Sequence, residues 1–282
     1  MAASCHTRSN SFPTRSHPQI LEVEEHLRRL RSSQAASTSS LGHELNGLQD
    51  LHDSVEKILQ LPLVQQALAR GHQKKWVDEL LNGSFKILDV CSTAQNALLQ
   101  MKESALGLQS VLRRRRGDET ELTSEIKKYL ASRKAMRKAI NKTLGNLKGV
   151  ENECSPSINE EHVSVLKEVE AVTLATFEYL LSFISGSRTP SKLSRFALVT
   201  KLIRPKRIAC QEDQTEMNEF EKVDAALSTV VGHKTIKSDN IIYMQNQLKE
   251  MESSIQDLEE GLESLSRRLI KARVPLLNIL TN

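Results

Sequence analysis

Aromatic residues, glycine and proline are scarce in this chain of 282 residues. Phe, Trp and Tyr together make up 4% of it, and there are 11 glycines and 7 prolines. A β-sandwich or β-barrel needs many turns and strands rich in aromatic residues, so the scarcity argues against both folds. The four cysteines show no paired spacing. They therefore exclude a disulfide scaffold and fit a reducing compartment.

Long apolar runs and a large net charge are also missing. A membrane-spanning helix needs roughly 18–20 apolar residues, and the best candidate, residues 172–184, is shorter and carries Glu178. We expect that segment to be a buried helix. The net charge of +4 is too small to indicate a nucleic-acid-binding protein. Residues 1–21 contain no acidic residue, which is also a feature of organelle transit peptides. A flexible tail of a cytoplasmic protein is the favoured interpretation, with a peripheral membrane, chloroplast or nuclear location left open.

The sequence has no signature of an enzyme or of a metal site. It contains no glycine-rich phosphate loop, no His-Glu-x-x-His motif and no nucleophile elbow. Neither His162 nor His233 has a partner at a spacing suited to metal ligands. We therefore predict a protein without catalytic activity, cofactor or metal.

What the sequence does contain is helical periodicity along almost its whole length. Apolar residues recur every three or four positions, and Pro62 and Gly71 bound a short helix. The pattern predicts an all-α protein, an elongated multi-helix bundle. A disordered tail over residues 1–18 precedes a single domain over 19–282. Loops are expected near residues 32–40, 149–156 and 186–191.

The last helix shows the most regular pattern. Two apolar positions repeat every seven residues over five heptads, as in a coiled coil: Ile241, Leu248, Ile255, Leu262 and Leu269 at one, and Met244, Met251, Leu258, Leu265 and Ala272 at the other. Phe220, Val223, Leu227 and Val230 continue this register backward, with an interruption at Lys234 and Lys237, and Pro275 should end or kink the helix. So many apolar residues must be covered. We favour packing within the chain, and a homodimer through residues 241–272 is the alternative.

Ser11 is a candidate phosphorylation site. Arg8 lies three residues before it, as a basic-directed kinase requires, and Pro13 lies two residues after it. Ligands of phosphoserine-binding adaptors of the 14-3-3 kind share this arrangement, in which an arginine cluster of the adaptor binds the phosphate. An unmodified tail is the simpler alternative.

A basic segment over residues 188–207 is a second candidate site. Apolar residues alternate there with seven basic residues and no acidic one: Arg188, Lys192, Arg195, Lys201, Arg204, Lys206 and Arg207. Such a segment can lie on an anionic membrane or be bound by calmodulin. Alternatively, it is a connector that docks on the bundle while its charges meet the acidic residues between 212 and 221.

Two further features have a structural interpretation. The run Arg113 to Arg116 could be a nuclear-import or nucleic-acid patch, but it ends a predicted helix, where cations complement the helix dipole. Trp76, the only tryptophan, is expected to pack in the core and not to anchor a partner.

Several segments resemble a plant family of helical proteins related to BYPASS proteins. They include residues 8–18, the sequence from Leu59 to Pro62, the run from Lys75 to Ser84 with its continuation to Cys91, and the ending from Arg273 to Leu280. The resemblance spans nearly the whole chain. It implies a non-enzymatic plant protein, associated with root and shoot development, that regulates or scaffolds through protein partners. A peripheral membrane or trafficking adaptor that uses residues 188–207 is the alternative.

Overall fold

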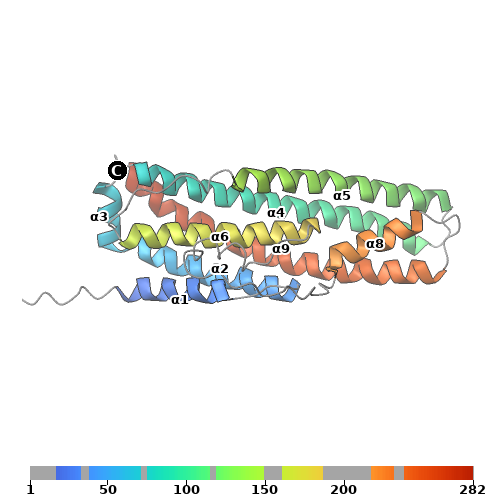
Figure 1. The fold of residues 1–282 in the computed structure, drawn as a ribbon, viewed down its shortest axis with the longest axis horizontal. Helices are drawn as coiled ribbons and strands as arrows, with labels where there is room; N and C mark the ends of the chain where they lie inside the picture. The colour runs from blue at the N-terminus through green and yellow to red at the C-terminus, as the bar shows by residue number, and fades with distance from the viewer. Residues whose placement is uncertain are drawn as a thin grey trace, which may run out of the picture.

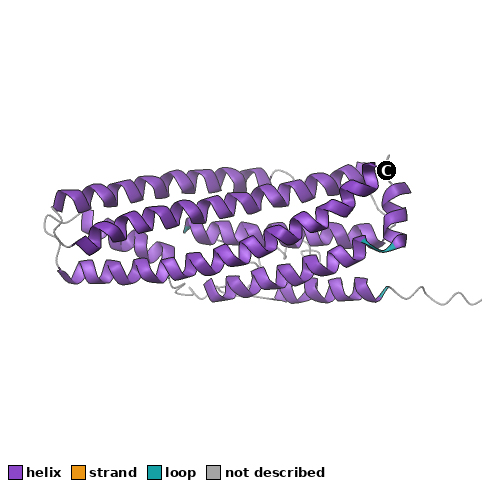
Figure 2. Cartoon of the chain, turned by 180° about the vertical axis from the view of Figure 1, so that it is seen from behind, coloured by secondary structure: helices purple, strands orange, loops and turns teal. Residues whose placement is uncertain are grey.

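The computed structural model describes residues 17–32, 38–70, 75–114, 119–148, 161–186, 217–231 and 238–281. Within these ranges the chain forms helices and contains no strand (Figure 2), which confirms the all-α prediction. Residues 1–16 of the tail predicted over 1–18 and the loop predicted near 149–156 lie outside them, whereas Pro18 already begins a helix. The helices are α1 (Pro18–Ser32), α2 (Thr38–Leu59), α3 (Pro62–Arg70), α4 (Lys75–Arg114), α5 (Glu119–Lys148), α6 (Glu161–Ser185), α8 (Glu219–Val231) and α9 (Ser238–Thr281).

The helices lie side by side along one axis and form an elongated bundle (Figure 1). The short helix α3 lies at the end where the C-terminus is, and α8 packs near the other end. Helix α9 is central to the packing because α2, α4 and α8 all contact it. Apolar side chains from all eight described helices join in one continuous core.

Nine of the ten heptad residues of α9 are buried within this single chain, as predicted, and Ile241 is partly buried against the core. Each residue at the second heptad position is less than 9% exposed, and Leu248, Ile255 and Leu262 at the first position are fully buried. Gly261 lets α9 approach α2, because a Cβ atom there would lie 3.0 Å from Leu45. The bundle therefore covers the seam. Homodimerisation through residues 241–272 stays a prediction, and it would have to replace these contacts.

The residues that continue the register of the last helix backward form a helix of their own. Phe220, Val223, Leu227 and Val230 are buried, but they belong to the separate helix α8. Helix α8 runs beside α9 in the opposite direction (Figure 1), so the chain reverses between them. Gly232 and the lysines at 234 and 237 interrupt the apolar repeat between the two helices. Because of this interruption, residues that share one heptad register form two separate helices.

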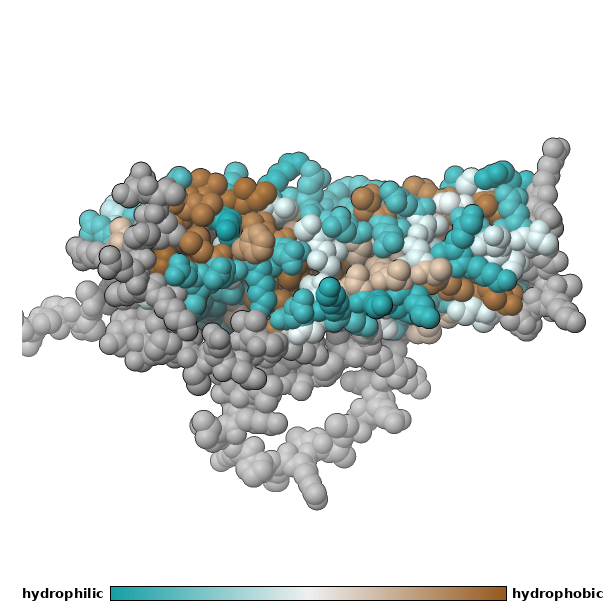
Figure 3. All heavy atoms as spheres, turned by 90° about the horizontal axis from the view of Figure 1, so that it is seen from above, coloured by the Kyte–Doolittle hydropathy of each residue, from teal (hydrophilic) through white to brown (hydrophobic). Residues whose placement is uncertain are grey.

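Pro275 does not end the last helix, contrary to one of the two predicted outcomes. Helix α9 continues through it to Thr281. Proline removes one backbone hydrogen bond, but side chains on both sides of it still pack, since Ala272 is buried and Leu276 is half-buried against the core. The outer side of this last part of α9 exposes Ile270, Val274 and Leu277. Figure 3 shows many apolar atoms on this end of the molecule.

Gly145 offers a test of helix propensity in α5. A Cβ atom at this position would meet nothing within 4 Å. Glycine costs roughly 0.5–1 kcal/mol relative to alanine inside a helix. We therefore expect Gly145→Ala to raise the free energy of unfolding, measured in urea, by about that amount.

Gly186→Ala is the matched control, with the opposite expected sign. Gly186 follows α6 with a φ of 68°, in the left-handed region that alanine adopts only with strain. The substitution should therefore lower the stability. Equal effects of the two substitutions would contradict this explanation.

His52 is a histidine buried in the core of the bundle. It lies on α2, is 4% exposed, and its Nε2 atom is 3.0 Å from the Thr173 hydroxyl of α6. Burial disfavours the charged imidazolium and lowers the pKa of His52 to about 4, and the nearby Asp53 carboxylate only partly opposes this. The folded protein therefore holds a neutral His52 at neutral pH.

This neutral histidine should make the protein sensitive to acid. An unfolded histidine takes up a proton near pH 6.5, whereas folded His52 does so only near pH 4. The contribution of His52 to stability is thus complete above pH 6.5 and falls by about 1.4 kcal/mol per pH unit between the two values. Urea unfolding of wild type and His52→Phe across this range measures it. The exposed His43, changed to Gln, is the control; equal slopes for wild type and His52→Phe would refute the assignment.

Candidate functional site

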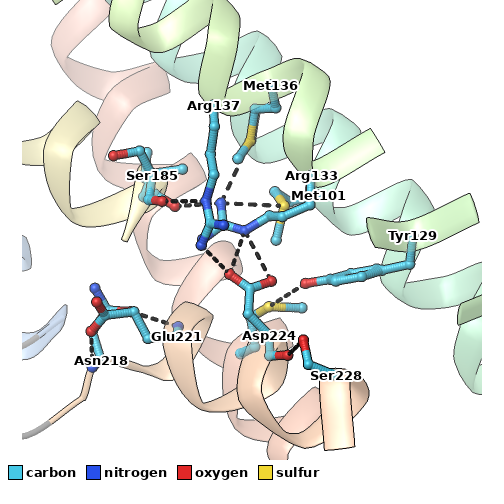
Figure 4. A network of polar contacts seen from close by, with 12 residues as sticks. Met101, Tyr129, Arg133, Met136, Arg137, Ser185, Asn218, Glu221, Asp224 and Ser228 are labelled. Carbon is cyan, nitrogen blue, oxygen red and sulfur yellow. Dashed lines mark hydrogen bonds and ion pairs between the residues drawn. The ribbon is translucent and has the colours of Figure 1, made fainter. Parts of the chain in front are cut away.

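A polar cluster centred on Asp224 joins the middle of α5 to the end of α6 and to α8 (Figure 4). Arg133 Nε of α5 donates to both carboxylate oxygens of Asp224, at 3.1 and 2.9 Å. Arg137 Nη2, one helical turn later, donates to Asp224 Oδ2 at 2.6 Å. The Arg133 side chain is 1% exposed and that of Asp224 is 13% exposed. Arg133 and Asp224 therefore form a buried ion pair, and the half-exposed Arg137 forms a second ion pair with the same carboxylate.

The same two arginines bind the end of α6. Arg133 Nη1 donates to the carbonyl oxygen of Ile184, and Arg137 Nε donates to that of Ser185 at 2.7 Å. Carbonyl groups in the last turn of a helix lack partners within the helix and carry its negative dipole end. The two guanidinium groups satisfy these carbonyls. Gly186 then turns the chain out of the helix in the left-handed conformation.

The start of α8 is fixed to the same place. Asn218 Oδ1 accepts a hydrogen bond from the Glu221 backbone at 2.9 Å, and Glu221 Oε2 accepts one from the Asn218 backbone at 3.1 Å. This reciprocal pair is a capping box. The Asn218 amide also donates to the Phe183 carbonyl of α6 at 2.9 Å. The first turn of α8 is therefore joined directly to the last turn of α6.

Aromatic packing strengthens this junction. Phe183 of α6 and Phe220 of α8 meet edge to face with their ring centres 5.9 Å apart, and the Arg133 guanidinium lies 5.6 Å from the centre of the Phe220 ring. Both aromatic side chains are buried. Polar and apolar contacts thus hold Gly186 and Met217 on the same part of the bundle. In the sequence, residues 187–216 lie between these two positions.

The chemistry of this cluster is that of an anchor. The carboxylate of Asp224 and the guanidinium groups of Arg133 and Arg137 bind one another and backbone carbonyls. Burial raises the pKa of the nearby Tyr129 hydroxyl, which keeps it a neutral donor, and it lies 3.6 Å from the sulfur of Met251. Among the described residues, no group of three or more His, Cys, Asp or Glu side chains could hold a metal ion.

The site residues predicted from the sequence fall in different places. Ser11, Arg8 and Pro13 lie outside the described residues, and so do the seven basic residues between 188 and 207. In the sequence, Ser185 and Asn218 of the cluster around Asp224 lie on either side of this basic segment. Arg113 and Arg114 form the last turn of α4, which confirms that the arginine run ends a helix. Trp76 is 7% exposed in the core, as predicted. No described helix is both long enough and apolar enough to cross a bilayer.

Sequence reasoning missed a basic surface on α5. From Ile126 to Lys148 this helix has eight basic residues and no acidic one. Arg133 and Arg137 are the two that bind Asp224. Four others are exposed and form no salt bridge to a described residue: Lys127, Lys134, Lys138 and Lys142. A charge count for each predicted helix would have revealed this surface.

Comparison with known proteins places the chain in a family. No curated protein and no solved structure matches it. The family model described as Protein BPS1 matches residues 44–279. The match runs from α2 to α9 and includes every residue of the cluster around Asp224. The chain therefore belongs to the BPS1 family, a BYPASS-related plant family.

Proposed function

We propose that this protein is a non-enzymatic regulatory or scaffold protein that acts in plant root and shoot development by binding protein partners. Membership of the BPS1 family supports the developmental role. The observation that carries the interaction role is the anchor around Asp224. It holds Ser185 and Asn218, which lie in the sequence on either side of residues 187–216, at one place on the bundle. The described parts of the chain on either side of residues 187–216 are therefore fixed side by side, and we propose that the residues between them bind the partner.

Proximity labelling with the full chain in root and shoot tissue tests this proposal. We expect a reproducible set of labelled proteins that differs from the set labelled by the free ligase. A variant with the seven basic residues of 188–207 changed to Gln should lose part of that set. The control changes Lys127, Lys134, Lys138 and Lys142 on α5 to Gln. If the labelled set equals that of the free ligase, the interaction role is refuted.

Recruitment of a phosphoserine-binding adaptor by Ser11 is one specific form of this function. The spacing of Arg8, Ser11 and Pro13 supports it. Mass spectrometry of plant-expressed protein should find phosphate on Ser11, and Ser11→Ala should abolish recovery of a 14-3-3-type adaptor. Ser9→Ala is the matched control because no arginine lies three residues before Ser9. Unchanged adaptor recovery with Ser11→Ala would refute this form of the proposal.

A second candidate function, a peripheral membrane or trafficking adaptor, is supported by charge. Each basic residue near an anionic membrane contributes about 1 kcal/mol of binding free energy. Residues 188–207 supply seven such residues, and the exposed lysines of α5 supply four more. These attractions weaken as salt screens the charges.

Flotation with anionic phosphatidylserine vesicles tests the membrane alternative. At low salt the wild type should float with the anionic vesicles. It should not float with neutral phosphatidylcholine vesicles, and at high salt it should not float with the anionic ones. Comparing the two Gln variants then assigns the contact to residues 188–207 or to α5. If wild type fails to bind anionic vesicles at low salt, the membrane alternative is refuted and the protein-partner proposal is unaffected.

A further inference from the structure

An exposed apolar patch lies on the outer side of α4 and α9, near the end of the bundle where the C-terminus lies. Phe85 of α4 and Ile270, Val274 and Leu277 of α9 form it, and each of these side chains is between 41% and 62% exposed. The three residues of α9 share one side of the helix because they are three or four positions apart. Exposed apolar groups that lie together mark an interaction surface.

Arg273 joins the two helices within the patch. Its Nη1 atom donates to the Leu81 carbonyl of α4 at 3.0 Å, and its guanidinium lies 5.8 Å from the centre of the Phe85 ring. Arg273 is three residues after Ile270 and four residues before Leu277. The exposed ring of Phe85 therefore lies at the same height along the bundle as these aliphatic side chains, and the four apolar residues form one surface.

The two edges of the patch carry opposite charges. On the α4 edge the exposed Asp89 lines a groove beside α5 together with Lys142, but no ion pair joins the two. On the α9 edge Arg267 and Lys271 are exposed, on the side where Arg268 binds α2. Lys271 has no ion-pair partner among the described residues, and Arg267 pairs only with an exposed glutamate one turn before it. The charges of Asp89 and Lys271 are therefore available to a partner.

The antiparallel packing of α4 and α9 sets the height of these charges along the bundle. Phe85 is level with Arg273, and each step forward along α4 corresponds to one step back along α9. Asp89, four residues after Phe85, is therefore level with the α9 position midway between Arg267 and Lys271. Both basic residues lie within about 3 Å of this level along the helix axis. The negative charge of one edge and the positive charges of the other thus share one level.

We propose that this patch binds the same patch of a second copy of the chain, in a symmetric dimer whose two-fold axis runs parallel to the helices. Such an axis places α4 of each copy opposite α9 of the other at an unchanged height. Phe85 then packs on Val274 of the second copy. Asp89 lies between Arg267 and Lys271 of the second copy, and the same contacts occur a second time by symmetry.

The charges of the two edges select this arrangement. A two-fold axis across the helices would place each edge against its own copy, so that Asp89 met Asp89 and the like charges repelled each other. The axis parallel to the helices brings the acidic edge of each copy to the basic edge of the other. A second copy is therefore a partner whose charges are complementary to this patch.

The dimer is expected to be weak. A standard interface has about 20–30 residues on each side, whereas the patch and its edges supply far fewer. We expect a dissociation constant of about 100 µM, so that the protein is monomeric at the low micromolar concentrations used for urea unfolding. The heptad seam stays covered within each copy. This dimer therefore differs from one that forms through residues 241–272, and it does not depend on the partner proposed for residues 188–207.

Sedimentation equilibrium of the full chain, from about 10 µM to about 1 mM, measures the association. We expect a monomer–dimer equilibrium for the wild type. Ile270→Glu places a charge in the apolar centre of the interface and should weaken dimerisation about tenfold or more. Leu106→Glu is the matched control, because Leu106 is an exposed leucine of α4 that lies outside the patch. It should leave the association unchanged.

An exchange of charges tests the pairing across the interface. Asp89→Lys and Lys271→Asp should each weaken dimerisation about tenfold, because each substitution creates like-charge contacts twice in a symmetric dimer. An equimolar mixture of the two single variants should restore dimers, since each lysine of one chain then faces an aspartate of the other. Both positions are exposed, so the urea midpoints should stay close to that of the wild type.

Three results would overturn the proposal. The first is a wild type that remains monomeric at about 1 mM, which would leave the patch to a different protein or to a lipid surface. The second is a mixture of Asp89→Lys and Lys271→Asp that associates no better than either variant alone. The third is an equal effect of Ile270→Glu and Leu106→Glu on dimerisation, because the apolar patch would then not be the interface.

Discussion

Replacing Asp224 with asparagine is expected to lower the free energy of unfolding by about 3–5 kcal/mol. The substitution keeps the size of the side chain but removes its charge. Arg133, whose side chain is 1% exposed, would then be a buried cation without its counter-ion. Removing one partner of a buried ion pair is costly because the other charge can neither return to water nor find a new partner.

Urea unfolding of the variant measures this effect. Asp50→Asn on α2 is the control, because Asp50 is exposed and its replacement should change the stability by less than about 0.5 kcal/mol. A stability of Asp224→Asn within that margin of the wild type would show that the pair is not an anchor.

A charge-free replacement refines this result. The variant with Arg133→Met and Asp224→Leu has no buried ion at this place. It also removes the Nη2 atom of Arg133, which is buried and has no hydrogen-bond partner among the described residues. We expect this double variant to recover most of the loss, since apolar pairs often replace buried ion pairs without cost. Arg137 would still bind the Ser185 carbonyl. Recovery would assign the effect to the uncompensated charge, whereas equal loss in both variants would assign it to the shape of the junction.

The sequence predicts the helices well because their signal is local. A residue three or four positions from another lies on the same face of a helix, so the apolar repeat of α9 specifies both the helix and its buried side. The same reasoning placed Trp76 in the core and ended α4 at its arginine run. It also separated α3 from α2 at Pro62.

The anchor could not be predicted because its signal is not local. Arg133 and Asp224 are 91 residues apart in the chain. In the sequence Arg133 is one of many basic residues on α5, and its neighbour Lys134 is exposed. Only the packing of α8 against α5 distinguishes the two. The reversal between α8 and α9 is also non-local, since the register of Phe220 and Val223 fits either a continuous helix or a packed neighbour.

Replacing Leu258 with alanine is expected to lower the free energy of unfolding by about 2–5 kcal/mol. Leu258 lies in the middle of the heptad seam of α9 and is fully buried. The substitution removes apolar contacts and leaves a cavity that closely packed helices can close only in part. Ile270→Ala on the same helix is the control, because Ile270 is 53% exposed and should contribute little.

The same experiment distinguishes the two ways of covering the seam. If the seam is buried within one chain, the urea midpoints of wild type and Leu258→Ala are independent of protein concentration. A homodimer through residues 241–272 would instead make both midpoints rise with concentration, because association stabilises by mass action. We expect no such rise, since α2, α4 and α8 already cover α9. A concentration-dependent midpoint, together with a large loss on Leu258→Ala, would mean that the seam joins two chains.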